Sequence, residues 1–142
     1  MALVNGSLVG RRVERVGRVY YVHDGQTSIG DGAVEIGFSD GSVRRYEVAG
    51  NGEGLRIEDT PWLDPFAEPL DAVNREYVRD VGKWTAFDVS DEEPYSQICG
   101  STVTAVEEIT NERGVIIGVL IGTDLGRLAA KVGADELWVV VT

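Results

Sequence analysis

The chain has 142 residues, of which 43% are hydrophobic, so it is long enough to bury a proper core as a single domain. Its 24 acidic and 13 basic residues give a net charge of −11, which disfavours direct binding to nucleic-acid phosphate or anionic lipid. The sequence has no apolar run of transmembrane length, no signal-peptide pattern and only one cysteine. These features predict a cytoplasmic protein without a disulfide that binds neither nucleic acid nor membrane.

The first part of the chain is rich in β-branched and aromatic residues separated by turn signals. Residues 10–22 predict one long bent strand, with Gly17 as the bulge at which the apolar alternation slips. Turn residues fill 23–32, and the sequence SDGS at 39–42 predicts a hairpin turn between the strands AVEIGF and VRRYEVAG. The segment GEGLRIED then closes a first β unit, which we place at residues 1–60.

A proline-rich linker and one helix are predicted for residues 61–82. Three prolines in TPWLDPFAEP forbid a regular helix or a central strand, so we expect an extended linker that lies on the sheet or barrel. Trp62 and Phe66 should pin this linker in place. In LDAVNREYVRDVG, apolar residues recur every three or four positions, which predicts a short helix that starts at the N-cap Asp71 and ends at Gly82. Its apolar stripe should dock on a sheet.

A second β unit is predicted for residues 83–142. It begins with a short strand, KWTAFDV, and an exposed acidic turn, SDEEPY. Four strands follow, in ICGSTVTAVEEIT, VIIGVLIG, RLAAKV and ELWVVVT, separated by turns at NERG, TDLG and GAD. Because the last strand is apolar without interruption from Leu137 to Val141, it is predicted to be central or covered on both faces.

The two units resemble each other in sequence. Residues 34–57, VEIGFSDGSVRRYEVAGNGEGLRI, align with residues 117–140, IGVLIGTDLGRLAAKVGADELWVV, and the preceding GRRVERV matches GSTVTAV. Two unrelated meanders in one sheet remain the alternative, because β sequences rich in valine and glycine align readily. The predicted fold is therefore mainly β: two small, similar antiparallel units, SH3-like barrel or meander, joined by the linker and helix in one compact domain.

No catalytic or cofactor motif accompanies these elements. His23 is the only histidine and has no strained serine turn to act with, and Cys99 is interpreted as a small buried core thiol. The GDG and GNGEG loops lack both a following helix and the lysine of a nucleotide-binding loop, so hairpin turns explain them. The acids of 88–93 lack the ligand spacing of a calcium loop. We therefore predict a protein that is not an enzyme and that holds no cofactor or metal.

The acidic excess is concentrated in residues 61–98, which contain nine acids and three bases. Aromatic residues lie among these acids, and aromatic anchors surrounded by charge are the usual composition of a protein-binding patch. The predicted partner-binding residues are Trp62, Asp64, Phe66, Glu68, Trp84, Asp88, Asp91, Glu92 and Glu93. In the alternative interpretation, the tryptophans fill the seam between the two β units and only the acids stay outside.

The segments PWLDPFAEPL and GKWTAFDVSDEEPY, with the small size and acidity of the chain, resemble the small acidic immunity proteins with which bacteria neutralise toxins. The resemblance is one of overall character, so it assigns no residue roles. It implies an inhibitor that covers the cationic cleft of a basic partner or mimics that partner's anionic substrate. The alternative is a regulatory or structural β-barrel module that binds a peptide or forms a homodimer through its strand edges.

Overall fold

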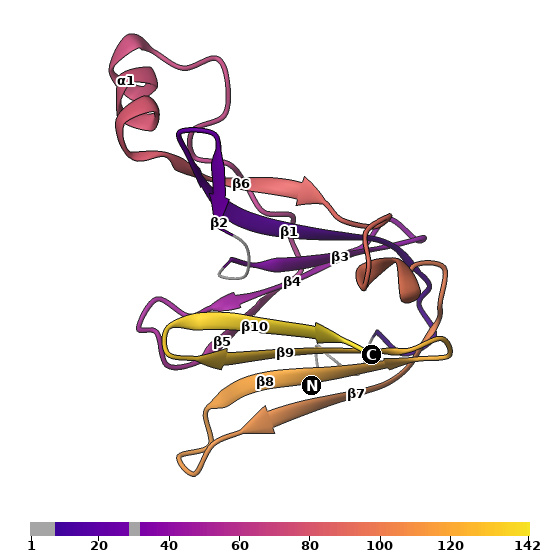
Figure 1. Cartoon of the computed structure of the whole chain (residues 1–142). Coiled ribbons are helices and arrows are strands. Elements are labelled where there is room, and N and C mark those ends of the chain that lie inside the picture. The colour runs from indigo at the N-terminus through magenta and orange to yellow at the C-terminus, as the bar shows by residue number, and fades with distance from the viewer. Residues whose placement is uncertain (1–7, 29–31) are drawn as a thin grey trace.

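The computed structural model describes residues 8–28 and 32–142, which form two antiparallel β-sheets packed face to face (Figure 1). The six-stranded sheet contains β1 (Val13–His23), β2 (Gln26–Ser28), β3 (Val34–Phe38), β4 (Val43–Val48), β5 (Leu55–Glu58) and β6 (Lys83–Asp88). The four-stranded sheet contains β7 (Val103–Thr110), β8 (Ile116–Thr123), β9 (Arg127–Gly133) and β10 (Glu136–Val141). The mainly β prediction is confirmed, but both sheets are open meanders and neither closes into a barrel.

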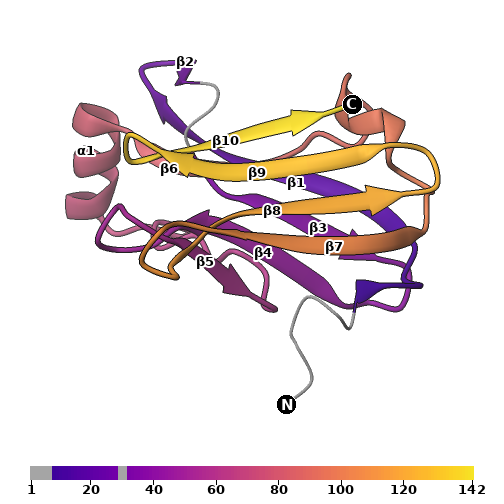
Figure 2. The same cartoon turned by 90° about the horizontal axis from the view of Figure 1, so that it is seen from below.

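The six-stranded sheet is organised around β1. One edge of β1 pairs with β3 and, further along, with β2, while the other edge pairs with β6. The meander continues from β3 through β4 to β5, and the chain then returns to add β6 beside β1. The strand that begins the predicted second unit therefore completes the sheet of the first. The four-stranded sheet is a simple meander in the order β10-β9-β8-β7 (Figure 2).

Equivalent backbone hydrogen bonds join the two meanders where β1 and β7 begin. The Gly10 N–H donates to the Val103 carbonyl at 2.8 Å, and the Gly100 N–H donates to the Val13 carbonyl at 2.7 Å. Both glycines have a left-handed backbone, with φ of 92° and 87°, which glycine adopts without strain. The two donors, Gly10 and Gly100, are 90 positions apart in the sequence, and so are the two acceptors, Val13 and Val103.

Each meander also has a β-bulge at the start of its first strand. The register of β1 shifts between Val13 and Arg15, and that of β7 shifts between Val103 and Ala105. Gly17, by contrast, keeps regular pairing with strands on both sides. The predicted bulge at Gly17 is therefore wrong, because the slip in apolar alternation there reflects residues that are covered on both faces of the sheet.

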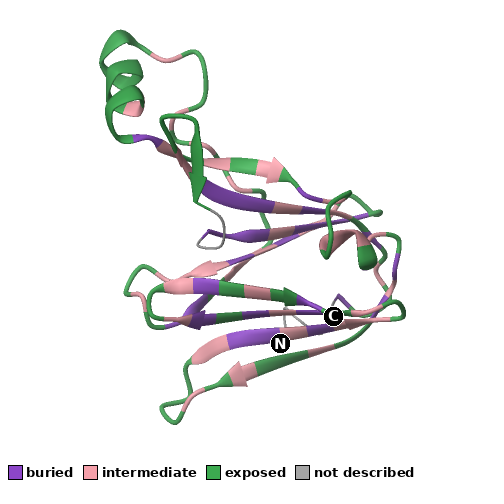
Figure 3. Cartoon of the chain, viewed as in Figure 1, coloured by how far each residue is buried: buried purple, intermediate pink, exposed green. Residues whose placement is uncertain are grey.

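The hydrophobic core lies between the two sheets (Figure 3). Alternate residues of each strand point inward, and the largest fully buried side chains include Tyr46, Ile36, Ile121, Leu128 and Leu137. Leu8 and Ile98, which precede the two bulged strands at equivalent positions, are both completely buried. Because these apolar side chains interdigitate, the inner faces hold the two meanders together and leave the outer faces free to differ.

The predicted helix is α1 (Ala72–Val81), with the Asp71 side chain accepting a hydrogen bond from the Asn74 N–H at 2.8 Å and Gly82 as its C-cap. Its apolar stripe does not dock on a sheet: none of its residues is buried, and Val73 is 75% exposed. This part of the prediction is wrong because α1 projects at one end of the molecule, where it lies beside the end of β1 rather than over the face of a sheet (Figure 1). Neither α1 nor any other helix in the described residues is long and apolar enough to cross a membrane.

The last strand, β10, lies at the edge of its sheet rather than at the centre. Its outward side chains Trp138 and Val140 are 58% and 55% exposed. The prediction that β10 is central or covered on both faces is therefore wrong for this structure of a single chain, although its inner face, with Leu137 and Val141, is buried in the core.

Candidate functional site

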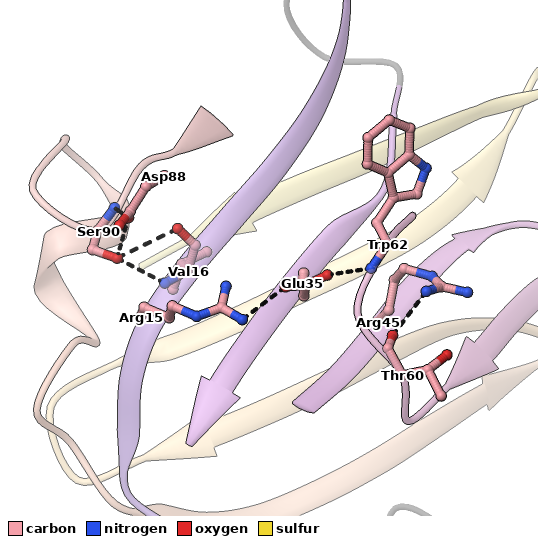
Figure 4. Close-up of polar contacts among 8 residues, drawn as sticks. All are labelled: Arg15, Val16, Glu35, Arg45, Thr60, Trp62, Asp88 and Ser90. Carbon is pink, nitrogen blue, oxygen red and sulfur yellow. Dashed lines mark hydrogen bonds and ion pairs between the residues drawn. The ribbon is translucent and has the colours of Figure 1, made fainter. Parts of the chain in front are cut away.

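The proline-rich linker crosses the outer face of the six-stranded sheet, and residues 59–70 are called the strap below. Glu35 on β3 accepts the Trp62 N–H at 2.7 Å with one carboxylate oxygen and the Arg15 guanidinium at 2.9 Å with the other (Figure 4). The Arg45 guanidinium donates to the Thr60 carbonyl at 2.8 Å. The predicted extended linker is thus held on the sheet by side chains of β3, β4 and β6 that reach its backbone.

The strap forms one wall of a cleft of about 400 Å³. Trp62 from the strap, Trp84 from β6 and the turn between β9 and β10 all contribute to its lining. The lining residues are Val19, Gly32, Ala33, Glu47, Val48, Trp62, Trp84, Asp135 and Glu136. The cleft therefore combines two aromatic side chains with three carboxylates, and it draws on both sheets and on the strap.

The turn that delivers Asp135 and Glu136 has an unusual backbone. Ala134 and Asp135 both have positive φ values, 53° and 64°, and they connect the paired residues Gly133 and Glu136. Two successive left-handed residues are typical of a type I′ hairpin turn, which favours asparagine, aspartate or glycine and strains an alanine. Backbone strain of this kind is concentrated at functional sites in proteins.

The floor of the cleft depends on close packing at Gly32. A Cβ atom at this position would lie 1.7 Å from the Val19 carbonyl oxygen and 3.1 Å from the Trp84 ring, so only glycine fits. Arg18, 3% exposed, holds the same segment from the interior by donating to the carbonyls of Gly32 and Ala33 at 3.2 and 3.3 Å. A buried arginine thus positions the floor between the two walls.

Arg18 is itself surrounded by aromatic rings. Its guanidinium donates to the Tyr95 hydroxyl at 2.6 Å and lies over the Tyr20 ring, 5.1 Å from the centroid. Burial raises the pKa of Tyr20 to about 12, so this phenol stays neutral beside the arginine at physiological pH. The cluster of Arg18, Tyr20 and Tyr95 thus supports the floor of the cleft from the interior, and its side chains do not line the cleft.

The carboxylates of the cleft are only partly neutralised. Glu47 pairs with Arg45 at 2.7 Å and lies 4.0 Å from Arg56. Asp135 and Glu136 form no ion pair within residues 8–28 and 32–142, and the remaining segments of the sequence contain no lysine or arginine. Within the described residues, the cleft therefore combines its two tryptophans with two carboxylates that have no cationic partner, which suits a cationic group.

A second depression, of about 390 Å³, lies on the α1 side of the same tryptophans and includes Phe66 and Tyr77. These two rings stack with their centroids 5.5 Å apart, so the strap and the helix hold each other. Lys83 donates to the Asp64 carboxylate at 2.5 Å. Although partial burial acts to raise it, the pKa of Asp64 is lowered, because Lys83 and the Phe66 N–H donate to its carboxylate.

The predicted partner-binding residues divide into two groups in the structure. Trp62, Phe66 and Trp84 come together around the strap, whereas Asp88 lies at the far end of β6, about 13 Å along the strand from Trp84. The acids of 91–93 follow Asp88 in the turn beyond that end.

Most of the predicted acids make local contacts. Asp64 is engaged by Lys83, Glu68 lies 3.3 Å from Arg75, and Glu93 accepts a hydrogen bond from the Gln97 side chain. Asp88 accepts from both the N–H and the hydroxyl of Ser90, which lower its pKa. Of the predicted acids, none lines the cleft that the two tryptophans form.

The acids that do line the cleft, Glu47, Asp135 and Glu136, were not predicted from the sequence. They belong to β4 and to the hairpin between β9 and β10, which are far apart in the chain. The GAD turn could be recognised as a turn, but its position opposite the strap depends on how the two sheets pack.

The described residues contain no group of three or more histidine, cysteine, aspartate or glutamate side chains arranged to hold a metal ion. His23 is exposed at the end of β1, and Cys99 is half-buried, with a pKa raised by burial. Comparison with protein-family models, with curated proteins and with solved structures finds no match to this chain.

Proposed function

We propose that this protein is a non-enzymatic binding module that takes a basic segment of a partner protein into the cleft between the strap and the β9–β10 turn. One observation supports this function above the others: a single cavity of about 400 Å³ is lined both by Trp62 and Trp84 and by Asp135 and Glu136, two acids that form no ion pair in the described residues. A lysine or arginine side chain can lie against an indole face while its charge meets a carboxylate.

The charge of the whole molecule supports the same function. A net charge of −11 attracts a basic partner over distances beyond direct contact and raises its rate of association at low salt. The aromatic walls then supply affinity that salt does not screen. We therefore expect a complex whose association is salt-dependent and whose dissociation depends on the two tryptophans.

Within this function, we propose an inhibitor of the immunity type, which blocks a basic toxin by occupying its cationic surface. The support is the general character of the chain: small size, strong acidity, and a preformed aromatic and acidic cleft. In this mechanism, the cleft captures a basic side chain of the toxin, and the surrounding acidic surface covers the toxin's substrate site.

Two charge-reversal variants, each of which replaces two acids by two lysines, test this proposal. Asp135→Lys with Glu136→Lys changes the cleft, and Asp91→Lys with Glu92→Lys makes the same change of charge in the exposed turn after β6. Tagged protein is incubated with lysate of the source cells, washed at low and then high salt, and analysed by mass spectrometry. We expect a stoichiometric basic protein with the wild type and the turn variant, but not with the cleft variant.

A defined probe tests the cleft without knowledge of the partner. Titration with a hexa-arginine peptide should change the tryptophan fluorescence of the wild type and of the turn variant, and the change should be lost in the cleft variant. Hexaglutamate is the control for non-specific quenching. Equal responses of both charge-reversal variants would place the binding elsewhere on the acidic surface, and loss of the response in the turn variant alone would place it at residues 91–93.

A further inference from the structure

The outer face of the four-stranded sheet carries apolar side chains that no other segment of the described chain covers. Strand register places outward side chains side by side in two rows. Val140, Ala129 and Leu120 form one row, and Trp138 lies in the next row, where Lys131 separates it from Ile109. Trp138 and Val140 are more than half exposed, and no strap crosses this face in the described part of the chain (Figure 3). Tryptophan and branched aliphatic residues at such exposure mark a surface that another molecule covers.

The free edge of β10 adjoins this face. Arg127 and Thr142 exchange both backbone hydrogen bonds, so in the antiparallel ladder the backbone groups of Val140 and Trp138 also point toward β9. The N–H and C=O groups of Leu137, Val139 and Val141 therefore point away from the sheet. Within residues 8–28 and 32–142, β10 pairs with no strand other than β9 (Figure 2).

This edge lacks the features that normally prevent strands from pairing. Exposed edges are usually protected by proline, lysine, a bulge or short length, whereas β10 has six residues in regular register and the sequence ELWVVV. The bulges of this sheet lie in β7, at the opposite edge. The regular, apolar edge of β10 is thus available for an additional strand.

Charge indicates which strand it accepts. The chain carries a net charge of −11, so most of its surface repels a second copy. The outer face of the four-stranded sheet is an exception, because Arg127 and Lys131 on β9 balance Glu107 on β7 and Glu136 on β10. Two copies of this chain can therefore meet here without the repulsion they would experience elsewhere.

We propose that two copies of the protein form a homodimer by antiparallel pairing of β10 with β10 about a two-fold axis at Val139. In this register, Leu137 of each copy lies opposite Val141 of the other, and the two residues exchange backbone hydrogen bonds. Trp138 lies opposite Val140 of the second copy in a non-hydrogen-bonded pair, where side chains are closest. The two acids at the start of each strand, Glu136, lie at opposite ends of the pair.

The self-complementarity of β10 is the reason to choose a second copy rather than a foreign strand. With the axis at Val139, every residue from Leu137 to Val141 meets an apolar residue, and the sheets of the two copies continue into one. The proposal does not rest on the function of the cleft, which lies at the turn before β10.

The wild-type protein provides a direct test. Sedimentation equilibrium over a range of concentrations should show a reversible dimer, and hydrogen exchange measured by NMR should show protection of the Leu137, Val139 and Val141 amides that increases with concentration. A protein that stays monomeric up to about 1 mM, which corresponds to negligible affinity, would overturn the proposal. So would a dimer in which these three amides exchange freely, because it would use another surface.

Variants sharpen the test. Val140→Lys places a charge beside the axis, and we expect the dissociation constant of the dimer to rise on the order of 100-fold, from the loss of apolar burial in both copies. Leu125→Lys is the matched control, because Leu125 is 64% exposed in the turn between β8 and β9 of the same sheet and should leave the dimer unchanged. Equal weakening by both variants, or an unchanged dimer with Val140→Lys, would contradict pairing through β10, and the hydrogen-exchange result stands even if a variant fails to fold.

Discussion

The two meanders share a backbone plan but differ in what covers their outer faces. On the six-stranded sheet, outward residues form ion pairs such as Arg15 with Glu35 and Arg56 with Glu58, and the strap lies across them. On the four-stranded sheet, the outward residues are largely apolar, and Trp138 and Val140 face solvent in a single chain. The inner faces must be apolar in both sheets for the core to form, so they carry little information about function.

The outer faces carry that information instead. Where a segment of the same chain covers a sheet, the chain supplies charged side chains to hold the backbone of that segment, as Glu35 and Arg45 do for the strap. Where the outer residues are apolar and nothing in the described chain covers them, the cover is expected to come from another molecule. The strap on the outer face of the first sheet contributes one wall of the cleft, and the uncovered outer face of the second sheet adjoins the strand that we propose as a subunit interface.

The largest expected effect tests whether the two meanders, which share a backbone arrangement, also contribute equally to the stability of the protein. Leu8 and Ile98 occupy equivalent, fully buried positions before β1 and β7. Replacement of either by alanine leaves a cavity in the core, and we expect a loss of about 3 kcal/mol in the free energy of unfolding for each. Urea denaturation measures both. A loss below about 1 kcal/mol for one variant alone would show that the two meanders are not equivalent at their junction.

The second prediction concerns the strap. Glu35 is the acceptor for both Trp62 and Arg15 and its side chain is only 12% exposed, so Glu35→Ala should destabilise the protein by about 2 kcal/mol. The Trp62 amide should also exchange faster, because it loses its acceptor. The matched control is Glu58→Ala, which removes a more exposed ion pair with Arg56 and should cost less than about 1 kcal/mol. Equal effects would mean that Glu35 does not hold the strap in place.

The third prediction is a gain in stability at the wall of the cleft. Ala134 adopts a left-handed backbone, which costs an alanine about 1 kcal/mol relative to glycine, so Ala134→Gly should stabilise the protein by roughly 0.5 to 1 kcal/mol. The same exchange at Ala129, in regular β9, should destabilise it by a similar amount. Midpoints of urea denaturation with unchanged slopes measure both changes. A loss of stability at Ala134 would contradict strain in this turn.

Much of this fold could be predicted because its signals are local. The strands of the second meander each end at a recognisable turn, and the helix has its cap residues at Asp71 and Gly82. The match between GRRVERV and GSTVTAV also has the 90-residue spacing of the hydrogen bonds made by Gly10 and Gly100. For the strands that follow, however, the structure and the sequence alignment disagree. Gly37 pairs with the residue after the bulge of β1, and Gly122 pairs with the residue after the bulge of β7, so the two glycines are structurally equivalent. The sequence alignment instead matches Gly37 to a residue two positions before Gly122. A shift of two keeps the same face buried, so hydrophobic pattern alone does not detect it.

The features that escaped prediction depend on distant contacts. Trp62 and Trp84 were recognised as anchors by residue type, but Asp135 and Glu136 come to line the same cleft only through the packing of one sheet on the other. The edge position of β10 could not be predicted either, because it too depends on contacts between distant segments. Its continuous apolar sequence reads as a strand buried on both faces, and a single chain buries only one of them.

The smallest expected effect is the acid dependence of the six-stranded sheet. The carboxyls with a lowered pKa in the described residues are Asp40, Asp64 and Asp88, and all belong to this sheet, its turns or its strap. For Asp88, the cause is hydrogen bonding by the Ser90 hydroxyl and N–H to its carboxylate. Ser90 also accepts the Val16 N–H at 2.9 Å, so this turn is attached to β1 (Figure 4).

The sign of the effect follows from the direction of the shift. Because the pKa of Asp88 is lower in the folded protein than the usual value of about 3.9, its hydrogen bonds stabilise the fold fully above that value, and the stabilisation is lost as the pH falls through the lowered pKa. Asp88→Asn removes this titration. The difference in stability between wild type and variant should therefore be constant from pH 7 to about pH 4 and shrink below it. Asp91→Asn changes the same charge in the same turn outside this hydrogen-bond set, so an equal acid dependence in that variant would assign the effect to net charge rather than to the attachment of the turn to β1.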